Sequence, residues 1–356
     1  MIADDLTGAC DSGVQFAQNG FKTVVLRGNE WGKDPAAELI VVSTDSRNDA
    51  PHVARQKVMD ACGRMKKQGV HVIYKKIDST LRGNEGAEIE AVLDACGFSE
   101  AVVTPAFPEM GRVVVRGRLK TPGGASALGV PALNVRAHLS CSKPLDVVDA
   151  ATPEDLDAAT EKALARSPAP LLAGSAGLAS HLAAALAYRM DRTPAAPQPR
   201  KTAKPVLFLI GSDQPPTSAQ VSYIVGHGLA DVVSLERFDI AALDQARGER
   251  KHLVLRPAVH QAPGLILLQR LAFLRPELLG AIVICGGDTA EAVCSVLQVA
   301  AIELVCELQR GIPWGFLSGG LVGGARIVTK AGGFSQPDSL ASIAAALTHW
   351  RTRNAA

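Results

Sequence analysis

The 356-residue sequence is poor in aromatic residues, which make up only 4% of the chain. Aromatic side chains provide the stacking surface for single-stranded nucleic acid, so their scarcity disfavours that class of partner. Lysine and arginine form no long run, and the formal net charge is only +2. Because nucleic acids and anionic membranes attract concentrated positive charge, we expect neither as a partner.

Paired cysteines and long apolar runs are also missing. The seven cysteines are scattered and include no CxxC pair, so we expect neither a disulfide framework nor a zinc site. No apolar run reaches the roughly 20 residues that span a bilayer. Charge appears already at position 4, which disfavours a secretory signal. These absences predict a cytoplasmic protein.

Short apolar stretches alternate with helical patterns in the first half of the chain. Strands are predicted over 21–26, 38–46, 70–79 and 100–107, and helices over 11–20, 50–69 and 84–97. This alternation predicts an α/β fold with a mainly parallel sheet flanked by helices. Ligands of such sheets bind beyond the carboxyl ends of the strands, so polar residues that follow strands are candidate site residues.

The best linker is a proline- and lysine-rich segment that lacks apolar periodicity. We therefore predict two α/β domains, 1–193 and 205–356, joined by a linker at 194–204, with the active site in the cleft between them. Residues 112–150 are less regular and contain a glycine-rich stretch, 121–132, which we expect to be a loop.

Polar side chains crowd the end of the predicted strand 70–79 and the start of the next helix. They are Lys75, Lys76, Asp78, Ser79, Arg82, Gly83 and Asn84. A guanidinium fork and the free N–H groups of a helix start both suit a carboxylate or a phosphate. Asn84 could equally be an ordinary helix cap beside a surface Arg82. The density of polar groups favours a site for a small polar ligand.

Two adjacent aspartates, Asp4 and Asp5, follow the first short apolar stretch. Like charges repel, so a solvated turn is the simple interpretation. The alternative is that the pair faces a ligand, a metal or a transferable proton. Arg47 follows a neighbouring strand, where it could be a second anion ligand or only part of a turn. Arg112 lies in a proline-rich loop for which a structural role is as plausible.

Three glycine- or serine-rich turns follow predicted strands in the second half. Their candidate residues are Ser212, then Gly286, Gly287, Asp288 and Thr289, then Lys330, Gly332 and Gly333. Glycines let the backbone approach phosphate, and Asp288 or Thr289 can cap a helix or contact metal-bound water. Any one turn could be structural, but the three together favour a nucleotide pocket. None matches GxxxxGK[ST] or GxGxxG.

In this order, the segments resemble the four-carbon acid sugar kinase family. The matching pieces are IADDLTGACDSGVQFAQNG, KKIDSTLRGNEGAEIEA, TPAFPEMGR, LLAGSAGLA, IGSDQPPTSAQ, CGGDTAEAV and VTKAGGFSQPDSL. The resemblance implies that 1–193 binds a sugar acid and 205–356 binds a nucleotide. It also implies ATP-dependent phosphorylation of the terminal (4-) hydroxyl of threonate, erythronate or 3-oxo-tetronate.

The resemblance also implies roles for residues of the second half. ATP would contact Ser212, the turn from Gly286 to Thr289, and the Gly332–Gly333 pair. As a hypothesis, Asp288 lies near Mg²⁺ and Lys330 offsets the charge that develops during transfer. No residue is assigned as a direct metal ligand.

A substrate site is hypothesised in the first half. Arg82 and Lys76, with Arg47 as a further candidate, would hold the carboxylate and hydroxyls of the acid. Asp5 would orient or deprotonate the attacking hydroxyl, with Asp4 and Asp78 as alternatives. Ser79, Gly83 and Asn84 complete the predicted substrate contacts.

Two rival functions are weighed against the kinase. A catalytically impaired homologue would bind the acid as a sensor without turnover. A nicotinamide dehydrogenase is disfavoured because DDLTGA stands where GxGxxG would follow the first strand. The expected partners are the sugar acid and ATP, and a homodimer is the candidate assembly.

Overall fold

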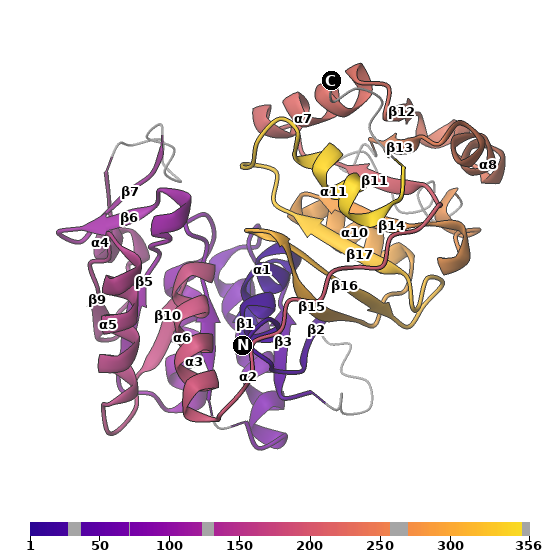
Figure 1. Ribbon diagram of the computed structural model, residues 1–356. Coiled ribbons are helices and arrows are strands. Elements are labelled where there is room, and N and C mark those ends of the chain that lie inside the picture. The colour runs from indigo at the N-terminus through magenta and orange to yellow at the C-terminus, as the bar shows by residue number, and fades with distance from the viewer. Residues whose placement is uncertain (28–36, 71, 123–131, 257–269, 351–356) are drawn as a thin grey trace. The chain divides into compact units, whose positions relative to one another are not determined.

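The computed structural model describes residues 1–27, 37–70, 72–122, 132–256 and 270–350 (Figure 1). The chain forms two compact units, Met1–Ala195 and Ala196–Ala356, and each is described by itself. The division falls inside the proline-rich segment expected to be a linker. Within the described ranges, no helix is both long and apolar enough to cross a membrane.

The first unit is built on a parallel sheet with the strand order β2-β3-β1-β4-β10-β5-β9. Its strands are Ile2–Ala3 (β1), Thr23–Arg27 (β2), Leu39–Ser43 (β3), Tyr74–Lys76 (β4), Ala101–Thr104 (β5), Leu145–Val147 (β9) and Leu171–Gly174 (β10). Strand β1 lies between β3 and β4, because the chain adds β2 and β3 on one side of it and then β4 on the other. Ligands of open α/β sheets bind at such a switch point.

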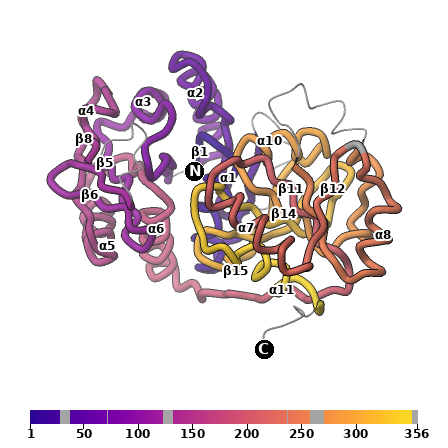
Figure 2. Tube along the Cα trace, turned by 90° about the horizontal axis from the view of Figure 1, so that it is seen from above, coloured from indigo at the N-terminus to yellow at the C-terminus, as the bar shows by residue number. Residues whose placement is uncertain are grey.

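Helices cover both faces of this sheet. They are Leu6–Ala17 (α1), Pro51–Lys67 (α2), Glu85–Cys96 (α3), Val135–Leu139 (α4), Pro153–Leu164 (α5) and Ala176–Arg189 (α6), with a short 3₁₀ turn at Pro108–Met110. Helix α1 packs against α6, and α6 against α5, whereas α2 packs against α3. Figure 2 shows α2 and α3 on one side of this unit and α5 and α6 on the other.

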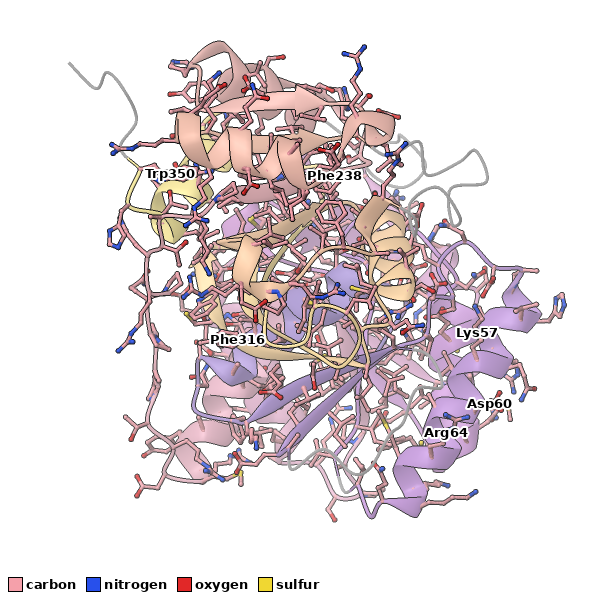
Figure 3. The ribbon with its side chains drawn as sticks, turned by 90° about the vertical axis from the view of Figure 1, so that its right-hand side faces the viewer. Lys57, Asp60, Arg64, Phe238, Phe316 and Trp350 are labelled. Carbon is pink, nitrogen blue, oxygen red and sulfur yellow. The ribbon has the colours of Figure 1, made fainter. Side chains whose placement is uncertain are left out.

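Helix α2 illustrates why these residues form a surface helix. Its buried positions, among them Val58 and Met65, recur at helical spacing. Lys57, Asp60 and Arg64 project from its outer side in Figure 3. The apolar stripe therefore faces the sheet and the charged stripe faces water.

Helix α1 begins at Leu6, well before the predicted start at residue 11. Strand β1 has only two residues, and Asp5 then caps the helix by accepting a hydrogen bond from the Gly8 N–H at 2.9 Å. An aspartate at this position satisfies one of the free N–H groups of the first turn. The predicted boundary was wrong because so short a strand has no recognisable period.

A small antiparallel sheet stands where the sequence indicated irregular structure. It contains Val113–Val115 (β6), Arg118–Lys120 (β7) and Leu133–Asn134 (β8). Arg116 and Gly117 both have positive φ, the conformation that a two-residue hairpin turn requires. Most of the glycine-rich stretch 121–132 lies outside the described residues.

The second unit has the strand order β12-β13-β11-β14-β17-β16-β15, in which β16 pairs antiparallel with both β17 and β15 and the other pairings are parallel. Its strands are Val206–Ile210 (β11), Ala230–Val233 (β12), His252–Leu255 (β13), Ala281–Cys285 (β14), Ala301–Gln309 (β15), Ile312–Ser318 (β16) and Arg326–Lys330 (β17). The switch point of this sheet lies between β11 and β14.

Helices also cover both faces of the second sheet. They are Pro215–Gly226 (α7), Ile240–Glu249 (α8), Gly287–Val296 (α10) and Ser339–Leu347 (α11), with 3₁₀ turns at Leu235–Arg237 and Pro276–Leu278. Alternate residues of β11, such as Phe208, form one buried cluster with α7 and α11. Figure 2 shows α10 on the opposite side of the sheet from α11. The predicted α/β class, with mainly parallel sheets flanked by helices, is confirmed.

Candidate active site

Arg47 joins the two adjacent aspartates at the switch point of the first sheet. Its Nε donates to Asp4 Oδ2 at 2.6 Å, and its Nη1 and Nη2 donate to the two oxygens of Asp5 at 2.8 and 2.9 Å. Asp4 is 2% exposed and Asp5 is 8% exposed. The solvated-turn interpretation of this pair was therefore wrong. The arginine offsets the repulsion that two buried like charges would otherwise suffer.

Asp78, after β4, is held by the residues that follow it. Its Oδ2 accepts from Arg82 Nε at 2.9 Å and from the backbone N–H of Arg82 at 3.2 Å. Burial alone would raise the pKa of Asp78, but Arg47 and Arg82 outweigh it and hold that pKa well below its usual range. Burial likewise opposes ionisation of Asp4, and Arg47 leads the charges that lower its pKa. Both carboxylates are therefore ionised at neutral pH.

The hydrogen bonds of Asp5 leave it little free acceptor capacity. Besides the two from Arg47, Asp5 accepts from Thr7 Oγ1 at 2.7 Å and from Gly8 N at 2.9 Å. A carboxylate offers about four lone-pair positions, so Asp5 is saturated. Asp4 Oδ1, by contrast, is buried without a hydrogen-bond partner. Of the two adjacent aspartates, Asp4 is therefore the one with an oxygen that no protein donor satisfies.

The adjacent lysines Lys75 and Lys76 point to opposite faces of the sheet, as neighbours on a strand do. Lys76 lies on the α1 side, where its Nζ would be 3.1 Å from a Cβ added at Gly8. Lys75 lies on the α3 side and forms a 2.7 Å ion pair with Glu88, with the two side chains 0% and 1% exposed. Only Lys76 therefore belongs to the candidate ligand site.

The Lys75–Glu88 pair supports the loop that carries Arg47. Glu88 Oε1 accepts a hydrogen bond of 2.6 Å from Ser46 Oγ, next to Arg47. Lys75 Nζ also donates to the Lys76 carbonyl at 2.7 Å. Sequence reasoning missed Glu88. Its available signal was a carboxylate on the buried face of a helix beside a strand with two consecutive lysines.

Asn84 connects two loops of the site. Its Nδ2 donates to the carbonyls of Ser46 at 3.0 Å and Asp49 at 2.9 Å, and its side chain makes no cap bond to α3. The ordinary helix-cap interpretation of Asn84 is thus wrong. Gly83 has φ +138°, and a Cβ there would lie 3.4 Å from Asp4 Oδ2. Glycine at this position keeps the backbone close to Asp4.

Two further groups at this edge were not among the predicted site residues. Arg112 Nη1 donates a hydrogen bond to Ser79 Oγ. Glu85 is 3% exposed, its Oε1 has no hydrogen-bond partner, and burial raises its pKa to about 8. Glu85 directly follows the predicted Asn84, so proximity in sequence was its available signal, whereas Arg112 lies 33 residues from Ser79 and had only its proline-rich loop to mark it.

In the second unit, three predicted turns meet at Ser212. A Cβ added at Gly332 would lie 1.9 Å from Ser212 Oγ, and one added at Gly286 would lie 3.6 Å from Ser212 Cβ. Gly286 has φ +108° and precedes α10, where Thr289 is buried in the first turn. Thr217 Oγ1 donates to the Gly332 carbonyl at 2.8 Å. The ends of β11, β14 and β17 thus converge, as the strand-end rule predicts.

The other predicted residues of these turns differ in accessibility. Gly333 and Asp288 are exposed, and Gly287 is partly exposed at the start of α10. Lys330 is 1% exposed, and its Nζ donates to the carbonyls of Ala331 at 3.0 Å and Phe334 at 2.8 Å. Burial lowers the pKa of Lys330. The observed contacts of Lys330 therefore hold the glycine turn in place and do not indicate a direct contact with a ligand.

Comparisons with known proteins identify the family. Residues 1–132 match the family described as a sugar-binding N-terminal domain, and residues 235–340 match a nucleotide-binding C-terminal domain. A Bordetella bronchiseptica protein named D-threonate kinase is 32% identical, over 99% of this chain and 98% of that protein. The chain belongs to the four-carbon acid sugar kinase family.

Other members and neighbours of the family agree with this placement. A Heliobacterium modesticaldum protein named D-erythronate kinase is 28% identical, over 93% of both chains. A crystal structure of a Salmonella typhimurium LT2 protein has a TM-score of 0.75 at 21% identity and covers 96% of this chain and 97% of its own. At that identity the crystal structure shows the shared fold alone. The relatives' names make this a family of carbohydrate kinases.

Proposed function

We propose that the protein transfers the γ-phosphoryl group of ATP to the terminal hydroxyl of a four-carbon acid sugar, such as threonate, erythronate or 3-oxo-tetronate. The observation that carries the proposal is the buried, hydrogen-bonded Asp4–Arg47–Asp5 cluster at the switch point of the first sheet. A small polyhydroxylated anion needs carboxylate acceptors at one end and cations at the other. Lys76, Arg82 and Arg112 supply the cations at the same edge.

The first unit would bind the sugar acid. Ser79 lies beside Asp78 and takes a hydrogen bond from Arg112, so its hydroxyl is fixed next to the proposed ligand. Gly83 leaves space beside Asp4, and Asn84 keeps the 46–49 turn in place. These contacts support the predicted grouping of Ser79, Gly83 and Asn84 around the substrate.

The second unit would bind ATP. Gly286, Gly332 and Ser212 present short side chains or none, which lets backbone N–H groups approach phosphate oxygens. Gly287 at the start of α10 and the exposed Gly333 extend the same surface. The N-terminal end of a helix favours negative charge, which α10 would offer to the phosphates.

The residues at the start of α10 also suit Mg²⁺. Asp288 and Thr289 provide hard oxygen donors, and Mg²⁺ in kinases is commonly held by one or two carboxylates together with the phosphates of the nucleotide. When bound there, the ion would neutralise charge on the phosphates. Lys330 would act indirectly by holding the Gly332 turn through its carbonyl contacts.

The proposed reaction forms no covalent bond to the protein, whose role is mainly to position the substrates and stabilise charge. The terminal hydroxyl oxygen forms a bond to the γ-phosphorus, the bond between that phosphorus and the β–γ bridging oxygen breaks, and ADP leaves. The hydroxyl proton passes to a carboxylate. Sequence reasoning favoured Asp5 as this base, but the saturated hydrogen bonding of Asp5 favours Asp4, whose buried Oδ1 accepts no hydrogen bond. Asp5 would then orient Arg47 and cap α1.

A panel of four-carbon acids, including 3-oxo acids, tested for ADP release would examine the function. We expect one or more acids to support turnover by the wild type. Asp4→Asn should lower kcat roughly 100-fold or more while calorimetry still detects binding of the acid. Asp5→Asn and Asp78→Asn should act mainly on binding and stability, and Asp60→Asn on the outer face of α2 is the matched control.

Specific outcomes would overturn each part. ADP release with none of the acids would remove the kinase proposal, and binding of the acid without binding of ATP would indicate a sensor. Normal turnover by Asp4→Asn would show that the base is another group. Cytoplasmic location and a homodimeric assembly remain predictions.

A further inference from the structure

We infer that Arg112 and Lys76 together bind the carboxylate of the substrate, so that Arg112 sets the preference for an acid sugar over a neutral one. The inference rests on the proposed function. It also changes the role of Arg47, which becomes a positioning residue for Asp4 and Asp5. Four contact patterns at this edge lead to it.

The donors of Arg47 are already engaged by protein carboxylates. Each of its three guanidinium nitrogens donates to Asp4 or Asp5 at 2.6 to 2.9 Å. Such a bidentate pair satisfies the guanidinium in both charge and geometry. Asp4 and Asp5 take three of its five N–H donors and Asp78 Oδ1 lies 4.0 Å from Nη2, so a substrate carboxylate there would have to compete with three protein carboxylates.

Arg82 is also paired, and it is more exposed. Its Nε and Nη2 donate to the two oxygens of Asp78 at 2.9 and 3.3 Å. Its side chain is 55% exposed, so water screens the charge that remains. Arg82 is therefore better placed to orient Asp78 than to be the main ligand of an anion.

Arg112 differs from both of these arginines. Across the described residues its one hydrogen bond goes to the neutral Ser79 hydroxyl, and no carboxylate lies within ion-pair distance of it. Its Nε and Nη2 are not among the described atoms that are both fully buried and without a partner. Burial lowers the pKa of Arg112, although a guanidinium stays charged at neutral pH. A bound carboxylate would supply the counter-charge that the protein does not.

Lys76 shows the same pattern. The residue is 4% exposed, yet in the described part of the chain its ammonium donates no hydrogen bond and forms no ion pair. The ammonium is also absent from the described atoms that are both fully buried and without a partner. A buried lysine whose donors are open is costly unless a ligand completes it.

The two cations lie along the same stretch of α1. Lys76 Nζ is next to Gly8 in the first turn of α1. The charge of Asp11, one turn further along the same helix, acts on the pKa of Arg112. Both also act on the charge of Asp78. The fork of Arg112 can grip a carboxylate with two parallel hydrogen bonds, and Lys76 adds a point charge.

The experiment compares the acid with its neutral amide as alternative substrates of the full-length protein. In the wild type, kcat/KM should favour the acid. Arg112→Gln should lower kcat/KM for the acid by roughly 10- to 100-fold, mainly through KM, and leave the amide within about twofold. Arg112→Lys should fall between the two. Arg116→Gln, at the exposed turn between β6 and β7, is the matched control.

The same design separates the inference from its alternatives. Unchanged selectivity in Arg112→Gln would overturn the inference. An equal loss of kcat with acid and amide would overturn it too, because Arg112 would then contact the transferred phosphoryl group. Calorimetry of threonate binding without nucleotide gives a second readout. If the wild type binds the acid but releases no ADP, the kinase proposal fails, and loss of that binding in Arg112→Gln would still support the inference.

Discussion

The candidate ligand edges of the two units place their charge in different ways. In the first unit, buried charged side chains line the edge, including Asp4, Lys76 and Asp78. In the second unit, glycines and hydroxyls line it, and the one buried lysine of that turn, Lys330, donates to backbone carbonyls. One edge is thus built from side-chain charge and the other from backbone.

This difference follows from the ligands that each edge is proposed to take. A four-carbon acid offers few atoms, so each of its hydroxyl and carboxylate oxygens has to meet a side chain of matching polarity. Phosphates can be held by N–H groups, which need only a close approach of the backbone. Binding of the acid at the first edge should therefore be lost when a charged side chain is neutralised. Binding of phosphate at the second edge should be lost when a larger side chain blocks the approach to the backbone.

The largest expected effect is a loss of stability when one charge is removed from the buried Lys75–Glu88 pair, which supports the first edge. Glu88→Gln leaves Lys75 buried without its carboxylate partner, 2.7 Å away in the native protein. Breaking a buried pair on one side destabilises a protein by about 3–5 kcal/mol. Urea denaturation of the full chain measures the change. The double variant Lys75→Met/Glu88→Met should recover much of it, because two apolar side chains leave no charge unpaired.

A surface ion pair on the same helix supplies the control. Arg55→Gln breaks the 2.6 Å contact with Asp94 of α3, where both side chains are about one-third exposed. Exposed pairs contribute about 0.2–1 kcal/mol. An equal loss in Arg55→Gln and Glu88→Gln would mean that burial does not distinguish the two pairs.

The next effect is a dependence of the free energy of unfolding on pH, which we attribute to Glu85. Its pKa rises from 4.5 to about 8 because of burial, with the charges of Asp4, Asp78 and Glu88 adding to the shift. His138 Nε2 lies 3.9 Å from its Oε2. Below pH 4.5 both the folded and the unfolded states keep the proton. Between 4.5 and 8 only the unfolded state loses it, so the free energy of unfolding falls by about 1.4 kcal/mol per pH unit.

Glu85→Gln should remove this slope and stabilise the protein most at pH 8 and above. The measurement is urea denaturation at several pH values from 5 to 8, compared as the difference between variant and wild type. Glu154→Gln, an exposed change in the first turn of α5, is the control. A difference that does not vary with pH would show that Glu85 ionises normally.

One geometric rule let the sequence predict the candidate ligand edge of the first unit. The carboxyl ends of parallel strands meet at one edge, so Asp4, Arg47 and Asp78 can be grouped from the sequence alone. The same rule grouped Ser212 with Gly286 and Gly332. Strand alternation could also have separated Lys75 from Lys76, because neighbouring strand residues face opposite layers.

The pairing of charges could not be predicted in this way. Arg47, Arg82 and Arg112 are alike in sequence, and only tertiary contacts show that the first two face aspartates and the third faces a serine. The antiparallel hairpin at 113–120 was missed for a related reason. Its strands have three residues each, too few for a period of two to be recognised.

The smallest effect tests the backbone-built edge of the second unit. Gly332→Ala would place a Cβ 1.9 Å from Ser212 Oγ and 2.6 Å from Ser212 Cβ, so one turn has to move away from the other. We expect the KM for ATP to rise about tenfold, which corresponds to about 1.4 kcal/mol, with little change in the KM for the acid. Gly248→Ala in α8 is the matched control, because nothing lies within 4 Å of its added Cβ and it lies outside the glycine turns.

A second substitution separates crowding from chemistry at this turn. Ser212→Gly removes both atoms that the new Cβ would meet, so Gly332→Ala/Ser212→Gly should bind ATP better than Gly332→Ala alone. If Ser212→Gly by itself raises the KM as much as Gly332→Ala does, the hydroxyl of Ser212 is a ligand whose loss matters more than space. Binding of ATP at the second edge would then depend on a side chain, as binding of the acid at the first edge does. The two edges would differ only in that the first uses formally charged side chains and the second uses a neutral one.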